Sequence, residues 1–207
     1  MIITKIKQYG LRNSFKRLIK LLLRYCGFQM ESYFLYRQRI DMSKIKRVEI
    51  NPKYTVKKLS YENYENSIGL KFDESKLNIF SKRFESSNYA AYGILDAEAL
   101  VYSSWISTNQ FEVSINTFGL EIELDEALLL DCLTHPKHRG KGLHNYMNRY
   151  CLEKMMEHKR SKALVLVIKE NIPAQKSQQR SGFKKIKVIN SFSFFGKKNI
   201  RVKEIKC

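Results

Sequence analysis

Two glycines, Gly140 and Gly142, separate an apolar segment of the chain from an amphipathic one. The apolar run 127–133 has the length of a buried strand, and over 142–157 apolar residues recur at helical spacing. Glycines let backbone N–H groups converge on a ligand, and a helix N-terminus favours anions. The sequence therefore predicts a strand–turn–helix junction that can bind a pyrophosphate, with the turn Pro136-Lys137-His138-Arg139-Gly140-Lys141-Gly142.

Two other sites with similar residues are disfavoured here. The turn is not a P-loop, because Gly142 follows Lys141 where that motif needs serine or threonine. The spacing of Cys132, His135 and His138 resembles that of metal ligands. Side chains on a turn that presents its backbone to phosphates need not converge, so no metal is expected.

The rest of the chain predicts alternating strands and helices after Pro52. Asp73 is a plausible N-cap, and the tail is rich in strand-like segments. The expected strands cover 33–40, 54–59, 89–95, 100–106, 112–118, 127–133, 163–168 and segments around 191–195 and 200–205, and the expected helices cover 62–67, 74–85, 142–157 and 173–180.

The charge of the chain indicates an anionic partner. It has 38 basic and 20 acidic residues among 207, a formal net charge of +18, and the excess lies at the two ends. The length suits one domain with an added element. The four cysteines, Cys26, Cys132, Cys151 and Cys207, show no paired spacing, so we expect free thiols in a reducing cytoplasm.

The segment 11–25 predicts a cationic amphipathic helix. Its apolar residues recur at helical spacing between lysines and arginines, and its longest apolar run, 21–23, is too short to span a bilayer. The stripe could dock on the main domain or lie on an anionic membrane surface, and the sequence leaves both open. We expect residues 1–51 to form a basic extension with this helix and one strand, and residues 52–207 to form the main domain.

The phosphate turn resembles that of the Gcn5-related N-acetyltransferase family, in which a Pro-x-x-Arg-Gly-x-Gly turn opens the main helix. A second match follows a buried strand at the family's spacing, with Asn171, Ala174 and Gly182-Phe183. The resemblance runs from about Tyr54 to the C-terminus. It implies an α+β fold, an α/β/α sandwich with a mixed, mostly antiparallel sheet and splayed central strands.

The same resemblance implies direct transfer of an acetyl group from acetyl-coenzyme A to an amine, without a metal. The backbone of residues 132–134 would align the pantetheine arm and polarise the thioester. The cofactor-binding residues would be Cys132, Leu133, Thr134, Arg139, Gly140, Lys141, Gly142, Leu143, His144 and Asn171.

The chain departs from the family at two positions. His144 stands where the turn usually closes with a small residue, so its side chain must point away from the phosphates or alter the turn. Gln178 stands at the position of the tyrosine that commonly protonates the departing thiolate, and an amide cannot act as an acid at neutral pH.

A protonated amine must lose a proton before it attacks, and Asp131, on the strand that carries the turn, is the candidate base. The alternative for Asp131 is hydrogen bonding at the end of the strand. Glu121 and Glu123, in an acidic connector, are the next candidates.

Two functions follow. The first is an N-acetyltransferase acting on a primary amine. Acetyltransferases with a basic N-terminal extension resemble those of bacterial surface-polysaccharide synthesis, which implies an amino sugar on a nucleotide- or lipid-linked precursor and a cytoplasmic enzyme, peripheral at the membrane. The second is a catalytically inactive module of the same fold that binds an anionic membrane or nucleic acid. No recognised nucleic-acid motif occurs, so nucleic acid is the less favoured partner.

Overall fold

The chain forms two units, each assembled from segments that are distant in the sequence. The computed structural model describes residues 15, 19–20, 22–23, 27–109, 111–114, 118–195 and 197–205. Unit 1 comprises residues 1–38, 111–121 and 164–207, and unit 2 comprises residues 39–110 and 122–163. Among the described residues, no helix has the length and apolar character needed to cross a membrane.

Unit 2 contains a sheet with the strand order β7-β4-β3-β2, in which every neighbouring pair is antiparallel. Its strands are β2 (Tyr54–Lys58), β3 (Tyr89–Asp96), β4 (Ala99–Ser107) and β7 (Glu126–Thr134). Its helices are α3 (Tyr61–Glu65), α4 (Glu74–Phe84), the short 3₁₀ helix η1 (Pro136–His138) and α5 (Leu143–Glu157).

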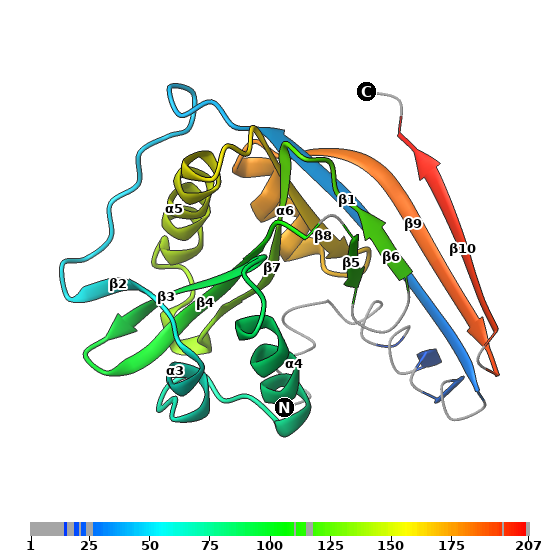
Figure 1. Cartoon of the computed structure of the whole chain (residues 1–207), viewed down its shortest axis with the longest axis horizontal. Helices are drawn as coiled ribbons and strands as arrows, with labels where there is room; N and C mark the ends of the chain where they lie inside the picture. The colour runs from blue at the N-terminus through cyan, green and yellow to red at the C-terminus, as the bar shows by residue number, and fades with distance from the viewer. Residues whose placement is uncertain are drawn as a thin grey trace. The chain divides into compact units, whose positions relative to one another are not determined.

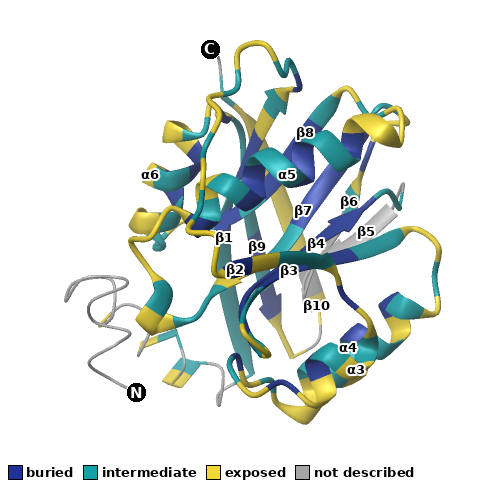
Figure 2. Cartoon of the chain, turned by 90° about the vertical axis from the view of Figure 1, so that its left-hand side faces the viewer, coloured by how far each residue is buried: buried dark blue, intermediate teal, exposed yellow. Residues whose placement is uncertain are grey.

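Helices cover both faces of this sheet. Successive residues of a strand point to opposite faces. Ser104 of β4 points towards α5, where its Oγ lies 3.4 Å from the Sγ of Cys151, and Trp105 points the other way, where its ring stacks on Tyr64 of α3 at 5.5 Å. Buried residues therefore line β3, β4, β7 and the inner side of α5 (Figure 2).

The face that Trp105 occupies carries an aromatic core. Asp73 caps α4 by accepting a hydrogen bond from the backbone N–H of Lys76 at 2.9 Å, as the sequence predicts. The apolar side of α4 then packs on the sheet. The aromatic rings that meet there belong to Tyr64, Phe72, Phe80, Phe84 and Trp105.

Unit 1 contains strands in the order β10-β9-β1-β8, with β1 antiparallel to β9 and β9 antiparallel to β10 (Figure 1). The strands are β1 (Phe28–Arg39), β8 (Lys162–Ile168), β9 (Lys184–Phe194) and β10 (Lys197–Glu204), and α6 (Ile172–Arg180) follows β8. A separate antiparallel pair is formed by β5 (Phe111–Ser114) and β6 (Phe118–Glu121).

The expected fold class, a mixed and mostly antiparallel sheet flanked by helices, is confirmed. Two expectations are corrected. The single strand expected over 112–118 is two strands, β5 and β6, and the strand expected around 191–195 begins at Lys184. The predicted helix 11–25 is helical at its described positions, and its ends lie outside the described residues. β1, part of the expected extension, pairs with β9, and the division at residue 52 stays a prediction.

Candidate active site

The turn between β7 and α5 presents its backbone to solvent. Gly140 and Gly142 both have a φ of +77°, in the left-handed region that side chains other than those of Asn and Asp rarely adopt. A Cβ at Gly140 would meet no atom within 4 Å, so the space beside the turn is open. The backbone therefore favours glycine at both positions, and a ligand can approach them closely.

The N-terminus of α5 offers backbone donors to an anion. The N–H of Tyr146 donates to the carbonyl of Gly142 at 3.0 Å, and the N–H groups of a first helical turn point along the helix axis towards its N-terminus. No acidic residue lies in the first turn, and Gly142 has no side chain with which to cap it. Arg139 and Lys141 are exposed beside the turn, so backbone and side chains together favour a phosphate.

His144 points away from this turn. Its Nδ1 lies 3.1 Å from the hydroxyl of Tyr102 on β4, and its Nε2 lies 3.4 Å from the amide nitrogen of Asn148 on the next turn of α5. Burial lowers the pKa of His144 to about 4 and raises the pKa of Tyr102 well above its usual value. The Tyr102 hydroxyl therefore stays protonated beside a neutral imidazole, and the His144 side chain does not cover the backbone of the turn.

This burial predicts a loss of stability in mild acid. The pKa of His144 is about 4 in the folded chain, below the usual 6.5, so the unfolded chain binds the proton more readily. The free energy of unfolding should fall as the pH drops from 6.5 towards 4, by about 2 kcal/mol at pH 5. Urea unfolding of the wild type and of His144→Asn at neutral pH and in mild acid measures this. Equal losses in both proteins would refute the assignment.

Strand β7 contains a bulge directly before the turn. Its pairing with β4 shifts between Leu130 and Leu133, so that Asp131 and Cys132 lie opposite a single residue of β4. Asp131 has a φ of +47°, an uncommon conformation that aspartate tolerates better than most residues. A bulge bends a strand and changes the direction of its side chains. Asp131 consequently points to the same face as Leu130, towards α4.

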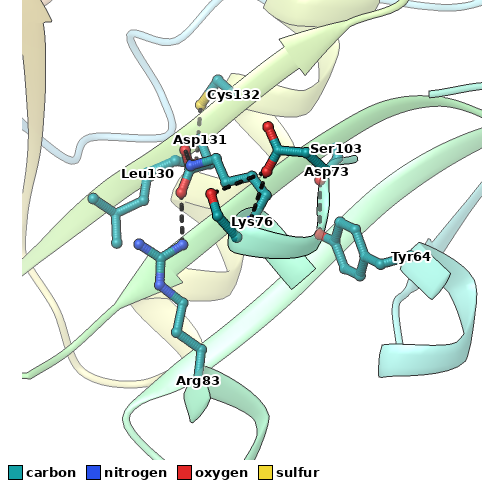
Figure 3. Close-up of polar contacts among 9 residues, drawn as sticks. Tyr64, Asp73, Lys76, Arg83, Ser103, Leu130, Asp131 and Cys132 are labelled. Atoms are coloured by element: carbon teal, nitrogen blue, oxygen red, sulfur yellow. Dashed lines mark hydrogen bonds and ion pairs between the residues drawn. The ribbon is translucent and has the colours of Figure 1, made fainter. Parts of the chain in front are cut away.

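Two cations of α4 bind the Asp131 carboxylate (Figure 3). The Nζ of Lys76 lies 2.5 Å from Oδ1, and the guanidinium of Arg83 lies 2.6 Å from Oδ2. The Arg83 side chain is only 7% exposed, and it lies over the rings of Tyr89 and Trp105 at 5.5 and 5.3 Å. Burial would raise the pKa of Asp131, but the charges of Lys76 and Arg83 outweigh it and lower the pKa.

These contacts bear on the expected roles of two residues. Both oxygens of Asp131 are engaged in ion pairs, and a lowered pKa makes a carboxylate a weaker base. The Cys132 thiol donates to the carbonyl of Leu130 at 3.8 Å, and burial raises its pKa to about 12. A protonated thiol is a poor nucleophile at neutral pH. The base role of Asp131 stays a prediction, and Cys132 is unsuited to carrying an acyl group.

The remaining predicted residues are placed as follows. Asn171, in unit 1, caps α6, because its side-chain oxygen accepts from the N–H of Ala174 at 3.3 Å. Gln178 is buried in the same helix. Glu123 lies 2.9 Å from the Nζ of Lys162, and Glu121 ends β6. Among the residues that the structure describes, no group of three or more His, Cys, Asp or Glu side chains could hold a metal ion.

Sequence reasoning missed the cations that face Asp131. Lys76 and Arg83 are seven residues apart, two helical turns, so they share one side of α4. That side also carries Phe80, a core residue. A basic residue on the apolar side of a helix needs a buried partner. The spacing of Lys76 and Arg83 around Phe80 therefore indicates a buried anionic partner for these cations. It does not indicate which carboxylate that partner is.

No protein-family model matches the sequence, and no curated protein is significantly similar to it. Solved structures are similar in fold. An acetyltransferase from the GNAT family from Colwellia psychrerythraea matches with a TM-score of 0.57 and 14% identity, over 81% of this chain and 57% of that one. A GCN5-related N-acetyltransferase from Kribbella flavida matches with a TM-score of 0.53 and 15% identity, over 86% and 63%.

A Drosophila protein matches with a TM-score of 0.58 and 15% identity, over 87% of this chain and 57% of that one. The chain thus spans less than two thirds of the length of each of these three proteins. At these identities the likeness shows the fold. The chain has the fold of the Gcn5-related N-acetyltransferases.

Proposed function

We propose that this protein is an N-acetyltransferase that moves an acetyl group from acetyl-coenzyme A to a primary amine. The observation that carries the proposal is the turn at Gly140 and Gly142, where an open backbone, the N-terminus of α5 and two exposed cations form one anion site. The resemblance to the Gcn5-related N-acetyltransferases implies that the anion bound at this turn is the pyrophosphate of acetyl-coenzyme A. Arg139 and Lys141 add charge, and Leu143 and His144 supply N–H groups.

The reaction that this arrangement supports is direct transfer. The amine nitrogen attacks the thioester carbonyl, a C–N bond forms, the C–S bond breaks, and the amine loses a proton while the thiolate gains one. Backbone groups of residues 132–134 stabilise the developing oxyanion. The protonated state of Cys132 supports this path over one with an acyl-cysteine intermediate.

Asp131 is assigned a positioning role within this mechanism, with its predicted role as base kept as the alternative. Its ion pairs to Lys76 and Arg83 hold the left-handed residue that forms the bulge. The bulge in turn sets the direction of the backbone from Cys132 to Thr134. Water completes the proton transfers, since Gln178 cannot protonate the thiolate.

The acceptor proposed is an amino sugar on a nucleotide-linked or lipid-linked precursor, modified on the cytoplasmic side of a membrane. Such acceptors carry phosphates, and the net charge of +18 favours an anionic acceptor over a cationic polyamine. This choice rests on charge and on the family resemblance of the basic extension.

Calorimetric titration of the full chain with acetyl-coenzyme A tests the proposal. We expect saturable binding, with free coenzyme A binding to the same site. The inactive membrane- or nucleic-acid-binding module is the competing function. A chain that ignores acetyl-coenzyme A but binds vesicles or nucleic acid would replace the proposed enzyme with that module.

A further inference from the structure

The positive charge of the protein is concentrated in unit 1. The segments of unit 1 contain 19 basic and 5 acidic residues, a net charge of +14, out of +18 for the chain. The phosphate turn lies in unit 2, so most of the basic excess lies outside the unit that carries this turn. The excess therefore calls for an anionic partner beyond the pyrophosphate.

The N-terminal helical segment differs from a helix docked on a hydrophobic core in which of its side chains are buried. Lys20 is directed inwards, with its Nζ 2.8 Å from Oε1 of Glu170 and its side chain only 15% exposed. Phe15, Ile19 and Leu22 are 64%, 42% and 59% exposed. Their spacing places them on one side of a helix, with Lys20 roughly 140° from Phe15. At its described positions, the helical segment buries a lysine and exposes three apolar side chains.

A second apolar group lies at the end of the β9–β10 hairpin. Phe194 and Phe195 are 56% and 75% exposed, and the ring of Phe194 lies 6.2 Å from that of Phe28. Phe195 donates its backbone N–H to the carbonyl of Gly27 at 3.0 Å. Gly27 has a φ of +74°, and a Cβ there would come within 3.0 Å of the Phe195 ring, so only glycine fits.

The helical group and the hairpin group both belong to unit 1. Gly27 follows Leu23, the last described helical position, by four residue steps, which span at most about 14 Å. Basic side chains flank the hairpin group. Lys197 pairs with Phe194 across the turn and is exposed, as are Arg201 and Lys203 on the edge strand β10.

We propose that this region is a docking surface for an anionic lipid bilayer, formed by the side chains of Phe15, Ile19, Leu22, Phe194 and Phe195. Aromatic and aliphatic residues that project outwards beside lysines and arginines match the boundary between acyl chains and anionic headgroups. The net charge of +14 on unit 1 favours a lipid surface, because a protein partner would need a matching acidic surface.

Vesicle co-sedimentation of the full chain tests the proposal. The probes are vesicles of equal parts phosphatidylglycerol and phosphatidylcholine, and vesicles of phosphatidylcholine alone. We expect binding to the anionic vesicles that weakens at high salt, and little binding to the neutral ones. The triple variant Phe15→Gln, Ile19→Gln, Leu22→Gln keeps good helix formers and should bind anionic vesicles at least about 10-fold more weakly.

A matched control substitutes three exposed apolar residues of unit 2, with Ile68→Gln, Leu124→Gln and Met156→Gln. This control should bind vesicles like the wild type. A second variant, Phe194→Gln with Phe195→Asn, removes the hairpin group and keeps a residue that tolerates the φ of +42° at 195. Circular dichroism and thermal unfolding are used to check that each variant is folded.

Several results would overturn the proposal. The proposal fails if the full chain does not bind anionic vesicles, or if it binds neutral vesicles equally well. It also fails if both apolar variants are folded and bind anionic vesicles like the wild type, or if the control variant of unit 2 loses as much vesicle binding as they do. Self-association through these residues without vesicle binding would assign the surface to a second copy of the chain. Acetyl-coenzyme A affinity, measured separately, reports on the proposed enzyme and is expected to stay unchanged in all variants.

Discussion

Replacement of Gly142 by aspartate should weaken the binding of acetyl-coenzyme A by about 100-fold, or roughly 3 kcal/mol. The carboxylate would lie at the N-terminus of α5, where the pyrophosphate is proposed to bind, and would repel it. The positive φ at this position should cost some stability, and the chain should still fold. Aspartate adopts a φ near +77° more readily than most residues, and the nearest atom to a new Cβ is Cγ1 of Val48 at 4.0 Å. Calorimetry measures the affinity.

The matched control is Gly142→Asn, which has the same shape and no charge. It should lose less than about 10-fold, since only the close approach of the backbone is affected. If the aspartate variant is folded and binds acetyl-coenzyme A as tightly as the wild type, the pyrophosphate does not bind at this turn.

The second large effect is expected for stability, on substitution of Asp131 by asparagine. Removal of one partner of a buried ion pair leaves the other charge uncompensated, and Arg83 is almost fully buried. We expect a loss of about 3 kcal/mol in the free energy of unfolding, measured with urea at neutral pH. Asparagine tolerates the left-handed conformation at this position, so the effect reports on charge.

Two controls accompany this variant. Glu157→Gln removes a carboxylate whose side chain is 58% exposed and paired with Lys154, and should cost less than about 1 kcal/mol. Addition of Arg83→Met to Asp131→Asn should recover part of the loss, because the unpaired cation is gone. Equal effects of Asp131→Asn and Glu157→Gln would mean that the Asp131 network contributes no more than a surface pair.

The same ion pairs set a pH dependence of stability. The folded-state pKa of Asp131 is lowered below its usual 3.8, chiefly by the charges of Lys76 and Arg83 against the effect of burial. The contribution of Asp131 to the free energy of unfolding is therefore present above pH 3.8 and is lost as the pH falls through the folded-state pKa. This window lies below that of His144, so the two effects separate in a pH series.

Local sequence patterns predicted much of the fold because they report on neighbours along the chain. The Asp73 cap, the apolar spacing of α5 and the glycine pair each act within a few residues, and the structure places all three as expected. The division of 111–121 into β5 and β6 was missed, because the sequence between the two strands contains no glycine or proline.

The contacts of the site depend on pairings that a single sequence does not contain. Asp131 was selected as a base from its place on the strand, whereas its partners come from α4, about fifty residues earlier, and meet it only through a bulge. The sequence predicts that His144 either points away from the phosphates or alters the turn, and its partner Tyr102 is set by the packing of α5 on β4. Contacts between residues that are so distant in the sequence are set by strand register and tertiary packing.

Release of free coenzyme A tests the central claim most directly. The full chain is incubated with acetyl-coenzyme A and a library of primary amines, including amino sugars linked to nucleotides, and the new thiol is measured over time. We expect thiol release that requires one class of amine and is lost in Gly142→Asp. Binding of acetyl-coenzyme A without amine-dependent release, across all amine classes, would contradict the assignment as an acetyltransferase.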